Sequence, residues 1–221
     1  MTVRTRYCAV KHMPKRGDLS KERILDAALR LVDVGGTESL TMRRVADELG
    51  VSPMGLYRRV ATRDEILDGL IDKALDALAV VPEPGAAWEV QLRSVFLSVH
   101  RTLLAHPGLI AILTSQSIST TRAMRAVEHM LAALRGAGFS PDAAIAAVAA
   151  LQSYTFGFTV QQRARTDADQ RSHLSSLRAL PADDFPQIHA LAADFSAWAS
   201  DEHFQTGLDW LLHGISQSAR E

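Results

Sequence analysis

The stretch TMRRVADELGVSPMGLYRRV, from Thr41 to Val60, limits the possible folds more than any other part of the chain. Thr41 and Ser52 each precede a short amphipathic run, and hydroxyl side chains are favoured at the N-cap of a helix. Gly50 lies between the two runs, where a glycine can end a helix with a positive φ. Pro53 takes the first helical position, which tolerates a missing N–H. The stretch therefore predicts two short helices joined by a tight turn.

The apolar residues of this stretch would lie on the inner faces of the two helices, at Val45, Ala46, Leu49, Val51 and Leu56. The outer face of the second helix then stays short, polar and basic. Such a helix can place its first residues at base edges in the major groove while flanking cations contact phosphates. A packing unit with solvated arginines is the alternative, but the consistent spacing of caps, turn and apolar positions favours a helix-turn-helix.

One helix precedes this stretch and another follows it. Ser20 can cap the first, whose apolar residues recur with a helical period until the Gly35-Gly36 pair. Thr62 and Glu65 have the spacing of a capping box, which predicts a fourth helix to about Val80. These helices would form a small head.

Beyond Pro82 and Pro84 the pattern is again helical, and no stretch is typical of a β-strand. The predicted helices are Trp88–Ala105, Pro107–Gln116, Thr120–Gly136, Pro141–Arg165, Asp184–Trp198 and Asp201–Ala219. The polar segment 166–182 has no clear period and predicts a flexible loop. The predicted fold class is all-α, with a three-helix head carrying the helix-turn-helix and a helical bundle behind it.

Charge divides the chain into two parts. Residues 1–63 contain 13 Lys and Arg against 7 Asp and Glu, a net charge of +6, and the remainder contains 11 against 18, a net charge of −7. A basic head suits a polyanion such as nucleic acid, although a membrane or an acidic protein would also attract it. Residues 1–18 are basic without helical periodicity, which predicts a flexible arm that either follows DNA or only aids solubility.

The single cysteine, Cys8, rules out an intrachain disulfide and fits a reducing compartment. No apolar run approaches the roughly 20 residues needed to span a bilayer, and the basic N-terminus lacks the apolar core of a secretion signal. We expect a cytoplasmic protein with no membrane partner.

Residues 20–75 resemble the DNA-binding domain of the TetR family of bacterial transcriptional regulators. The resemblance is carried by SKERILDAALRLVDVGG, SLTMRRVADELGVSPMGLYRRV and ATRDEILDGLID, most specifically by Leu56-Tyr57, Val60 and Arg63–Ile66. Residues 76–215 resemble, more weakly, the regulatory domain of the tetracycline-repressor branch. Together they imply an arm (1–18), a DNA-binding domain with a connecting helix (19–80), and a ligand-binding and dimerisation domain (81–221).

The resemblance implies roles for residues of the head. Arg43 matches a position that reaches a base edge, where the guanidinium fork suits guanine. The residues that match base-contacting positions of the recognition helix are Ser52, Pro53, Met54 and Gly55. Those that match phosphate-holding positions are Thr41, Tyr57 (with its ring packed), Arg59 and Arg63. Arg44 and Arg58 are either further contacts or plain surface charges.

An effector cavity in the body would have apolar walls with a few polar groups. Its predicted lining is Phe96, Val99, His100, Leu103, Leu113, Met130, Tyr154, Thr155 and Phe158. Each of these could equally be ordinary core, because every helical bundle needs such a stripe. The residues expected to hold a magnesium–tetracycline complex are replaced by Val95, Val99 and Leu113, so we expect no metal, no cofactor and no binding of that complex.

The same resemblance implies that two long helices of the body pair with the equivalent helices of a second subunit. The predicted dimer-interface residues on them are Ala144, Ala147, Leu151, Phe204, Leu208, Leu211 and Leu212. Core within one chain is the alternative for part of each stripe. A dimer is favoured because two heads are needed to read the half-sites of a palindromic operator.

The predicted function is therefore a DNA-binding repressor that a small, largely apolar effector releases from its operator. Effector binding would swing the fourth helix, at about 63–80, and change the separation of the two heads. An activator or an effector-independent DNA-binding protein is the alternative. An enzyme is not expected, because GxSxG, GxxxxGK[ST] and HExxH motifs are absent from the sequence.

Overall fold

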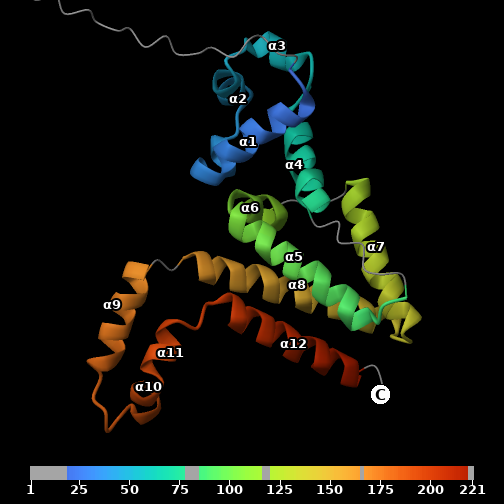
Figure 1. Cartoon of the computed structure of the whole chain (residues 1–221). Helices are drawn as coiled ribbons and strands as arrows, with labels where there is room; N and C mark the ends of the chain where they lie inside the picture. Colours follow the sequence, from blue (N-terminus) through green and yellow to red (C-terminus); the bar gives the residue numbers. More distant parts are fainter. Residues whose placement is uncertain (1–18, 78–84, 116–119, 165–166, 219–221) are drawn as a thin grey trace, which may run out of the picture.

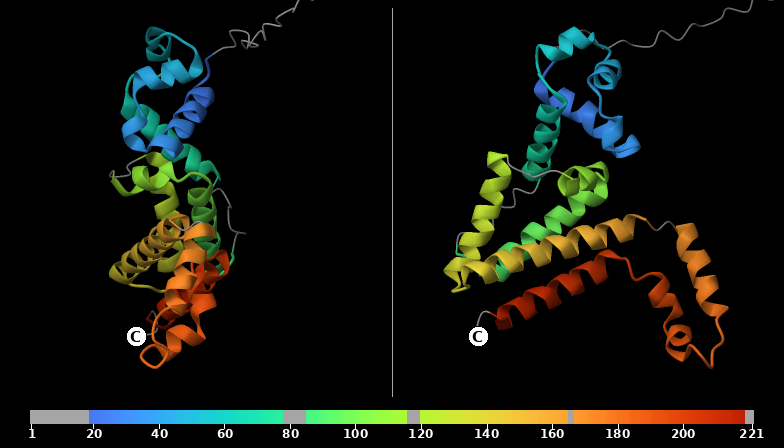
Figure 2. Two further views of the ribbon diagram at one scale, coloured as in Figure 1. Left: turned by 90° about the vertical axis from the view of Figure 1, so that its left-hand side faces the viewer. Right: turned by 180° about the vertical axis from the view of Figure 1, so that it is seen from behind.

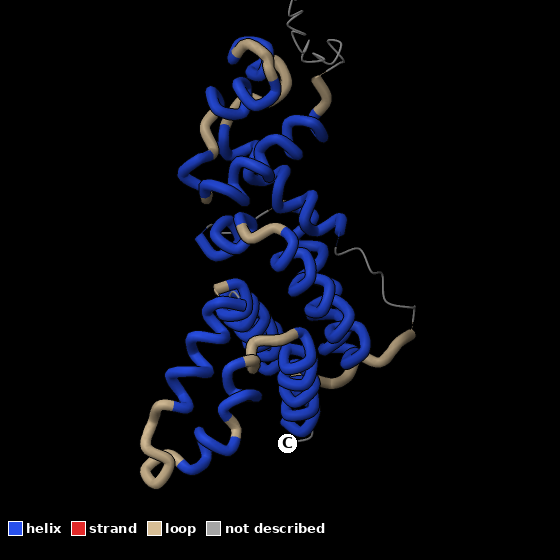
Figure 3. Tube along the Cα trace, turned by 60° about the vertical axis from the view of Figure 1, so that its left-hand side comes forward, coloured by secondary structure: helices blue, strands red, loops and turns tan. Residues whose placement is uncertain are grey.

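The computed structural model describes residues 19–77, 85–115, 120–164 and 167–218. All regular structure in these ranges is helical, as Figure 3 shows, which confirms the predicted all-α class. Helices α1–α4 form a head at one end of the molecule, and the longer helices form the body (Figure 1). The predicted arm 1–18 lies outside the described residues, as do the predicted helix ends at Val80, Gln116, Arg165 and Ala219.

The head is built from short helices that begin where the sequence predicts, and α1, α2 and α3 also end there. Its elements are α1 (Lys21–Gly35), the 3₁₀ turn η1 (Thr37–Ser39), α2 (Met42–Leu49), α3 (Pro53–Tyr57) and α4 (Arg63–Ala77). The hydroxyls of Ser20, Thr41 and Ser52 each accept a backbone N–H three residues ahead, at 3.1–3.3 Å. Gly50 ends α2 with φ 66° and ψ 32°, a conformation that favours glycine.

The body consists of long helices layered on one another. They are α5 (Trp88–Ala105), α6 (Gly108–Ser115), α7 (Thr121–Gly136), α8 (Pro141–Arg163) and α12 (Asp201–Ser218). Helix α8 packs against α5, α7 and α12, and α8 and α12 lie side by side in Figures 1 and 2. Their contact surfaces form a core of large apolar side chains that includes Phe96, Leu134, Leu151, Phe204 and Leu208.

Helix α8 is 23 residues long with a mean hydropathy of 1.4, so length and composition alone would let it cross a membrane. A core helix of a soluble protein passes the same test. In this chain α8 has α5, α7 and α12 packed around it. The core of the body therefore buries one side of α8, although only 39% of its apolar window is buried.

The segment between α8 and α12 corrects two predictions. The segment expected to be a loop over 166–182 contains α9 (Asp167–Arg178), and the single helix expected over Asp184–Trp198 is two short ones, α10 (Pro186–Ala190) and α11 (Ala192–Ser196). Helix α9 packs on α11 and buries Leu177 against it. A helix that buries so narrow a stripe keeps a polar sequence, which hides its period. Helices α9–α11 project from the rest of the body (Figure 2).

Candidate nucleic-acid interface

The helix-turn-helix presents one continuous exposed face. Val45, Ala46 and Leu56 are buried in the head. Met42 and Leu49 of α2 pack partly against the same core, and the polar side chains of α2 and α3 stay exposed. The exposed residues among those predicted to meet nucleic acid are Thr41, Arg43, Arg44, Ser52, Pro53, Met54, Tyr57, Arg58 and Arg59. These predicted residues are therefore exposed on α2, on α3 and on the segments directly beside them.

Apolar and basic side chains are mixed on this surface. Met54 is 69% exposed in the first turn of α3, although burial would be expected for a side chain of its kind. Gly55, which is half-buried, donates its N–H to the hydroxyl of Ser52 at 3.1 Å and adds no side chain. The first turn of α3 therefore carries an apolar side chain at Met54 and none at Gly55. A helix with such a first turn can approach the methyl group of a thymine closely.

Tyr57 and Arg63 differ from the predictions made for them. Tyr57 is 51% exposed, so its ring packs on the head only in part and the expectation of a packed ring is corrected. The half-buried Arg63 donates from Nε to the carbonyl of Leu40 and from Nη2 to that of Thr37, both at 2.9 Å. These bonds tie the start of α4 to the loop before α2, a positioning role that the sequence pattern did not indicate.

The core of the head continues into the body through α6. Leu109 and Ile112 of α6 are fully buried in the same cluster as Ile24, Val32 and Leu70 of the head. Helix α6 packs against both α1 and α4. A shift of α6 would therefore be felt directly by two helices of the head.

The residues predicted to line an effector cavity are divided between two cores. Leu103, Val99 and Leu113 pack with the head cluster. The body cluster contains Phe96, Met130, Tyr154 and Phe158. Their alternative role as ordinary core therefore accounts for most of the set.

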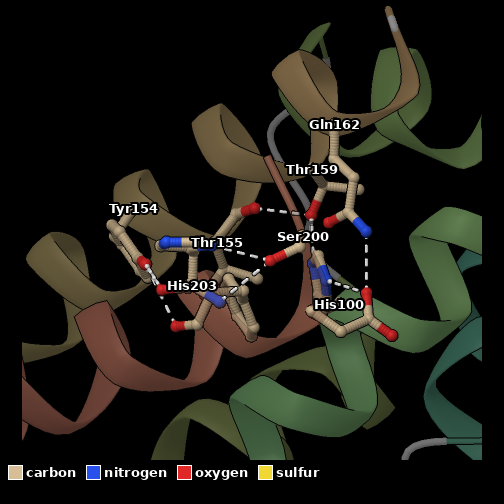
Figure 4. Close-up of polar contacts among 9 residues, drawn as sticks. His100, Tyr154, Thr155, Thr159, Gln162, Ser200 and His203 are labelled. Carbon is tan, nitrogen blue, oxygen red and sulfur yellow. Dashed lines mark hydrogen bonds and ion pairs between the residues drawn. The ribbon is translucent and has the colours of Figure 1, made fainter. Parts of the chain in front are cut away.

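The buried His100 is the centre of a polar cluster between α5, α8 and α12 (Figure 4). Thr159 donates its hydroxyl hydrogen to the carbonyl of Thr155 at 2.6 Å, so it accepts from Nδ1 of His100 at 2.8 Å. Nε2 of His100 faces the Asp201 carboxylate at 3.6 Å and has no hydrogen-bond partner. Gln162 donates to the same carboxylate oxygen at 2.7 Å. Thr159 and Asp201 were not singled out from the sequence, because their link to His100 exists only in three dimensions.

Burial lowers the pKa of His100 below its ordinary value, and the nearby Asp201 carboxylate opposes this shift without cancelling it. This shift favours the neutral form of the imidazole. Its ring stacks on Phe204 with a centroid distance of 3.7 Å.

An aromatic groove of about 470 Å³ lies on the surface beside this group. Its lining is Tyr154, Phe158, Trp198, His203, Thr206, Gly207, Trp210 and Leu211. Only Tyr154 and Phe158 of these belong to the predicted effector set. Trp210 joins them because α8 and α12 lie side by side, and Trp198 comes from the segment before α12. No local sequence pattern predicts this arrangement.

The predicted dimer-interface residues are mostly core within the chain, which corrects that prediction. Ala144, Ala147, Leu151, Phe204, Leu208 and Leu212 are all buried where α8 meets α12 and its neighbours. Leu211 is partly buried and lines the aromatic groove. The large apolar side chains that stay exposed on these two helices are Ile145 and Val160 of α8 and Trp210 of α12, which also lines the groove.

Comparison with known proteins gives matches over nearly the whole chain. The family model described as bacterial regulatory proteins, tetR family, matches residues 24–70, and that of the tetracyclin repressor-like C-terminal domain matches residues 81–219. An HTH-type transcriptional regulator of Saccharopolyspora erythraea is 32% identical, over 91% of this chain and 86% of its own. The HTH-type transcriptional repressor DrrR1 of Streptomyces coeruleorubidus is 28% identical, over 91% and 80%. ActR of Streptomyces coelicolor, in a crystal structure with actinorhodin, is 30% identical with a TM-score of 0.78, over 93% and 99%.

Proposed function

The chain belongs to the tetR family of bacterial regulatory proteins, and on that premise we propose that it is a repressor released from its operator by a small, largely apolar effector. Membership of the family confirms a DNA-binding transcriptional regulator and not an enzyme. The sign of regulation and the release by an effector are the proposal. Repression is supported by the similarity to a relative described as a repressor.

The observation that carries DNA binding is the exposed face of α2 and α3. Arg43 stands free to reach a guanine edge, and Met54 projects from the first turn of α3 toward the surface where a thymine methyl would lie. Tyr57 and the exposed arginines around it would hold phosphates and fix the register of the helix. Arg63 supports this face from behind through the loop before α2.

The effector is proposed to enter at the aromatic groove. Tyr154, Phe158, Trp198 and Trp210 offer flat apolar surfaces, and His203 and Thr206 add polar groups at its edge. This composition is typical of a small-molecule site. The structure of ActR with actinorhodin supports a small-molecule ligand in this branch of the family.

The active form is proposed to be a homodimer in the cytoplasm, bound to a palindromic operator. The exposed faces of α8 and α12 supply the contact surface, because Ile145, Val160 and Trp210 are large apolar side chains that water otherwise covers. Two heads related by a two-fold axis would read two half-sites about one helical turn apart.

Fluorescence anisotropy tests the proposal with a labelled duplex taken from the region beside the protein's own gene. We expect binding with a Kd of about 10⁻⁸ M or tighter at physiological salt, and release by at least one compound of a library of apolar small molecules that includes actinorhodin. Tetracycline with magnesium is expected not to release the complex.

Reporter transcription separates the remaining outcomes. A stable DNA complex that no compound releases would support an effector-independent DNA-binding protein. Increased transcription on binding would indicate an activator. Lack of binding to any duplex from that region, at low salt and with folded protein, would contradict the assignment of the operator.

A further inference from the structure

Asp33 lies near the end of α1 in the head, yet both oxygens of its carboxylate contact the body. Oδ2 lies 3.0 Å from Nδ1 of His106, the C-cap of α5, and Oδ1 accepts the backbone N–H of Gly108 at 3.0 Å. An ionised carboxylate can only accept, so His106 donates from Nδ1. The Asp33 side chain is 20% exposed and that of His106 is 41% exposed, so the carboxylate is more shielded from solvent than its imidazole partner. A single carboxylate of the head thus holds the junction between α5 and α6.

The backbones of α1 and α6 approach each other closely beside this carboxylate. A Cβ atom on Gly108 would lie 2.5 Å from Cγ1 of Val32 and 2.6 Å from the carbonyl carbon of Val32. The carbon belongs to the backbone and cannot rotate aside. Gly108 therefore allows the first turn of α6 to lie directly on the last turn of α1, where Asp33 can reach it.

The position of the carboxylate is also electrostatically favourable. Gly108 is the first residue of α6, and the N-terminus of a helix carries a partial positive charge. A carboxylate that accepts an N–H there is stabilised by that charge. Leu109 and Ile112 continue from this point into the core of the head. The polar bonds at Asp33 and the apolar packing of α6 therefore act on the same side of α1.

We propose that Asp33 is the positioning residue that fixes the orientation of the head on the body. This inference rests on the proposed function, because it says how a shift of α6 in the body moves a DNA-binding head. The Asp33 carboxylate makes α6 and α1 move together. In the described part of the chain the other contacts between α6 and α1 are apolar packing, which has less directional preference than these two hydrogen bonds.

Distances within one chain test the proposal without DNA or effector. Spin labels are placed at the exposed positions Asp47 in α2 and Ala132 in α7, after substitution of both by cysteine and of Cys8 by serine. The labelled protein is diluted with excess unlabelled protein, so that distances between subunits contribute little. We expect one narrow distribution for the parent, and a broader or shifted one for D33A and for G108A.

The matched control is D26A. Asp26 lies on the same helix and pairs with Lys73 of α4, so its removal deletes a carboxylate contact inside the head. We expect the distance distribution of D26A to equal that of the parent. D33N, which keeps an acceptor for the Gly108 N–H but loses the charge, should fall between the parent and D33A. It also keeps the proposal testable if D33A does not fold.

DNA binding supplies a second readout that a loss of stability alone would not move. At a temperature where circular dichroism shows D33A fully folded, we expect D33A to lose affinity for the palindrome and to keep its affinity for an isolated half-site. The expected loss is about 5- to 150-fold, the usual range of coupling between sites. An equal loss on both duplexes would overturn the positioning role.

The two proposals can fail separately. A parent-like distance distribution in D33A overturns the role of Asp33 and leaves the repressor function in place. If no compound releases the protein from DNA, the proposed release by an effector is wrong. A broadened distance distribution in D33A would still support Asp33 as the residue that orients the head on the body.

Discussion

The guanidinium of Arg63 donates from Nε to the carbonyl oxygen of Leu40 at 2.9 Å, and so joins the first residue of α4 to the loop that leads into α2. A second bond of the same length reaches the carbonyl of Thr37. The contact lies on the inner side of the DNA-binding surface and does not depend on DNA. Arg63 thus links the connecting helix to the residues that position α2.

We expect R63K to destabilise the head although it keeps the charge. A lysine has no planar fork, so it cannot make both bonds in this geometry. Hydrogen bonds of charged groups contribute about 1.5–3 kcal/mol each, and we expect the free energy of unfolding to fall by about that amount. Urea unfolding measures it, with R58K as the exposed control. If R63K and R58K unfold at the same urea concentration, the structural role of Arg63 is wrong.

Base contact by Arg43 predicts a loss of sequence specificity. R43A should weaken binding to the operator by about 1–3 kcal/mol and leave binding to unrelated DNA nearly unchanged. R59A, at a proposed phosphate position, should weaken both and reduce the salt slope of binding by about one. Anisotropy titrations at several salt concentrations measure these quantities. Equal losses on operator and unrelated DNA in R43A would place Arg43 among the phosphate contacts instead.

The local features of the fold could be predicted from the sequence, and its long-range pairings could not. Ser20, Thr41, Ser52 and Gly50 mark helix ends through contacts within a few residues, so a sequence pattern contains them. The apolar stripe of α12 can also be recognised in the sequence, because its residues recur with the helical period. Whether Phe204 faces its own α8 or a second subunit depends on which helix lies opposite, and periodicity carries no information on that.

The close contact between Gly207 and Tyr154 predicts a strongly destabilising alanine. The Tyr154 hydroxyl donates to the carbonyl of Phe204 at 3.0 Å, and a Cβ on Gly207 would lie 2.1 Å from that hydroxyl oxygen. G207A must displace the ring, so we expect a loss of about 1–3 kcal/mol in the free energy of unfolding. G214A is the control on the same helix, where a Cβ meets nothing within 4 Å and alanine favours the helix.

The double variant G207A/Y154L tests the cause of that loss. Removal of the ring and its hydroxyl relieves the overlap, so the two substitutions should be less damaging together than the sum of their separate effects. Additive losses, or a G207A variant as stable as G214A, would contradict the close contact.

The environment of His100 predicts a loss of stability in acid. The pKa of His100 is lowered in the folded state, so the unfolded state binds more protons once the pH falls below about 6.5. The free energy of unfolding should therefore decrease as the pH falls through that value and continue to decrease toward the lower folded pKa. H100N should reduce this dependence. Urea titrations between pH 7.5 and 5.0 measure it, with H129N on the exposed face of α7 as the control. An unchanged pH dependence in H100N would assign the acid sensitivity to other groups.

Trp210 predicts the site of dimerisation. Its side chain is 74% exposed on α12, and α8 also carries the exposed apolar side chains Ile145 and Val160. A tryptophan at the centre of an interface commonly contributes more than 2 kcal/mol of binding. W210E adds a charge that would be desolvated on association, so we expect it to shift the protein from dimer to monomer in light scattering coupled to size-exclusion chromatography. V90E introduces the same charge at an exposed apolar position of α5 and should leave the dimer intact.

DNA binding gives a second readout of the same variant. Because a monomer has one head, W210E should lose affinity for the palindrome and bind an isolated half-site as before. A W210E protein that remains dimeric would move the interface to another face of the body.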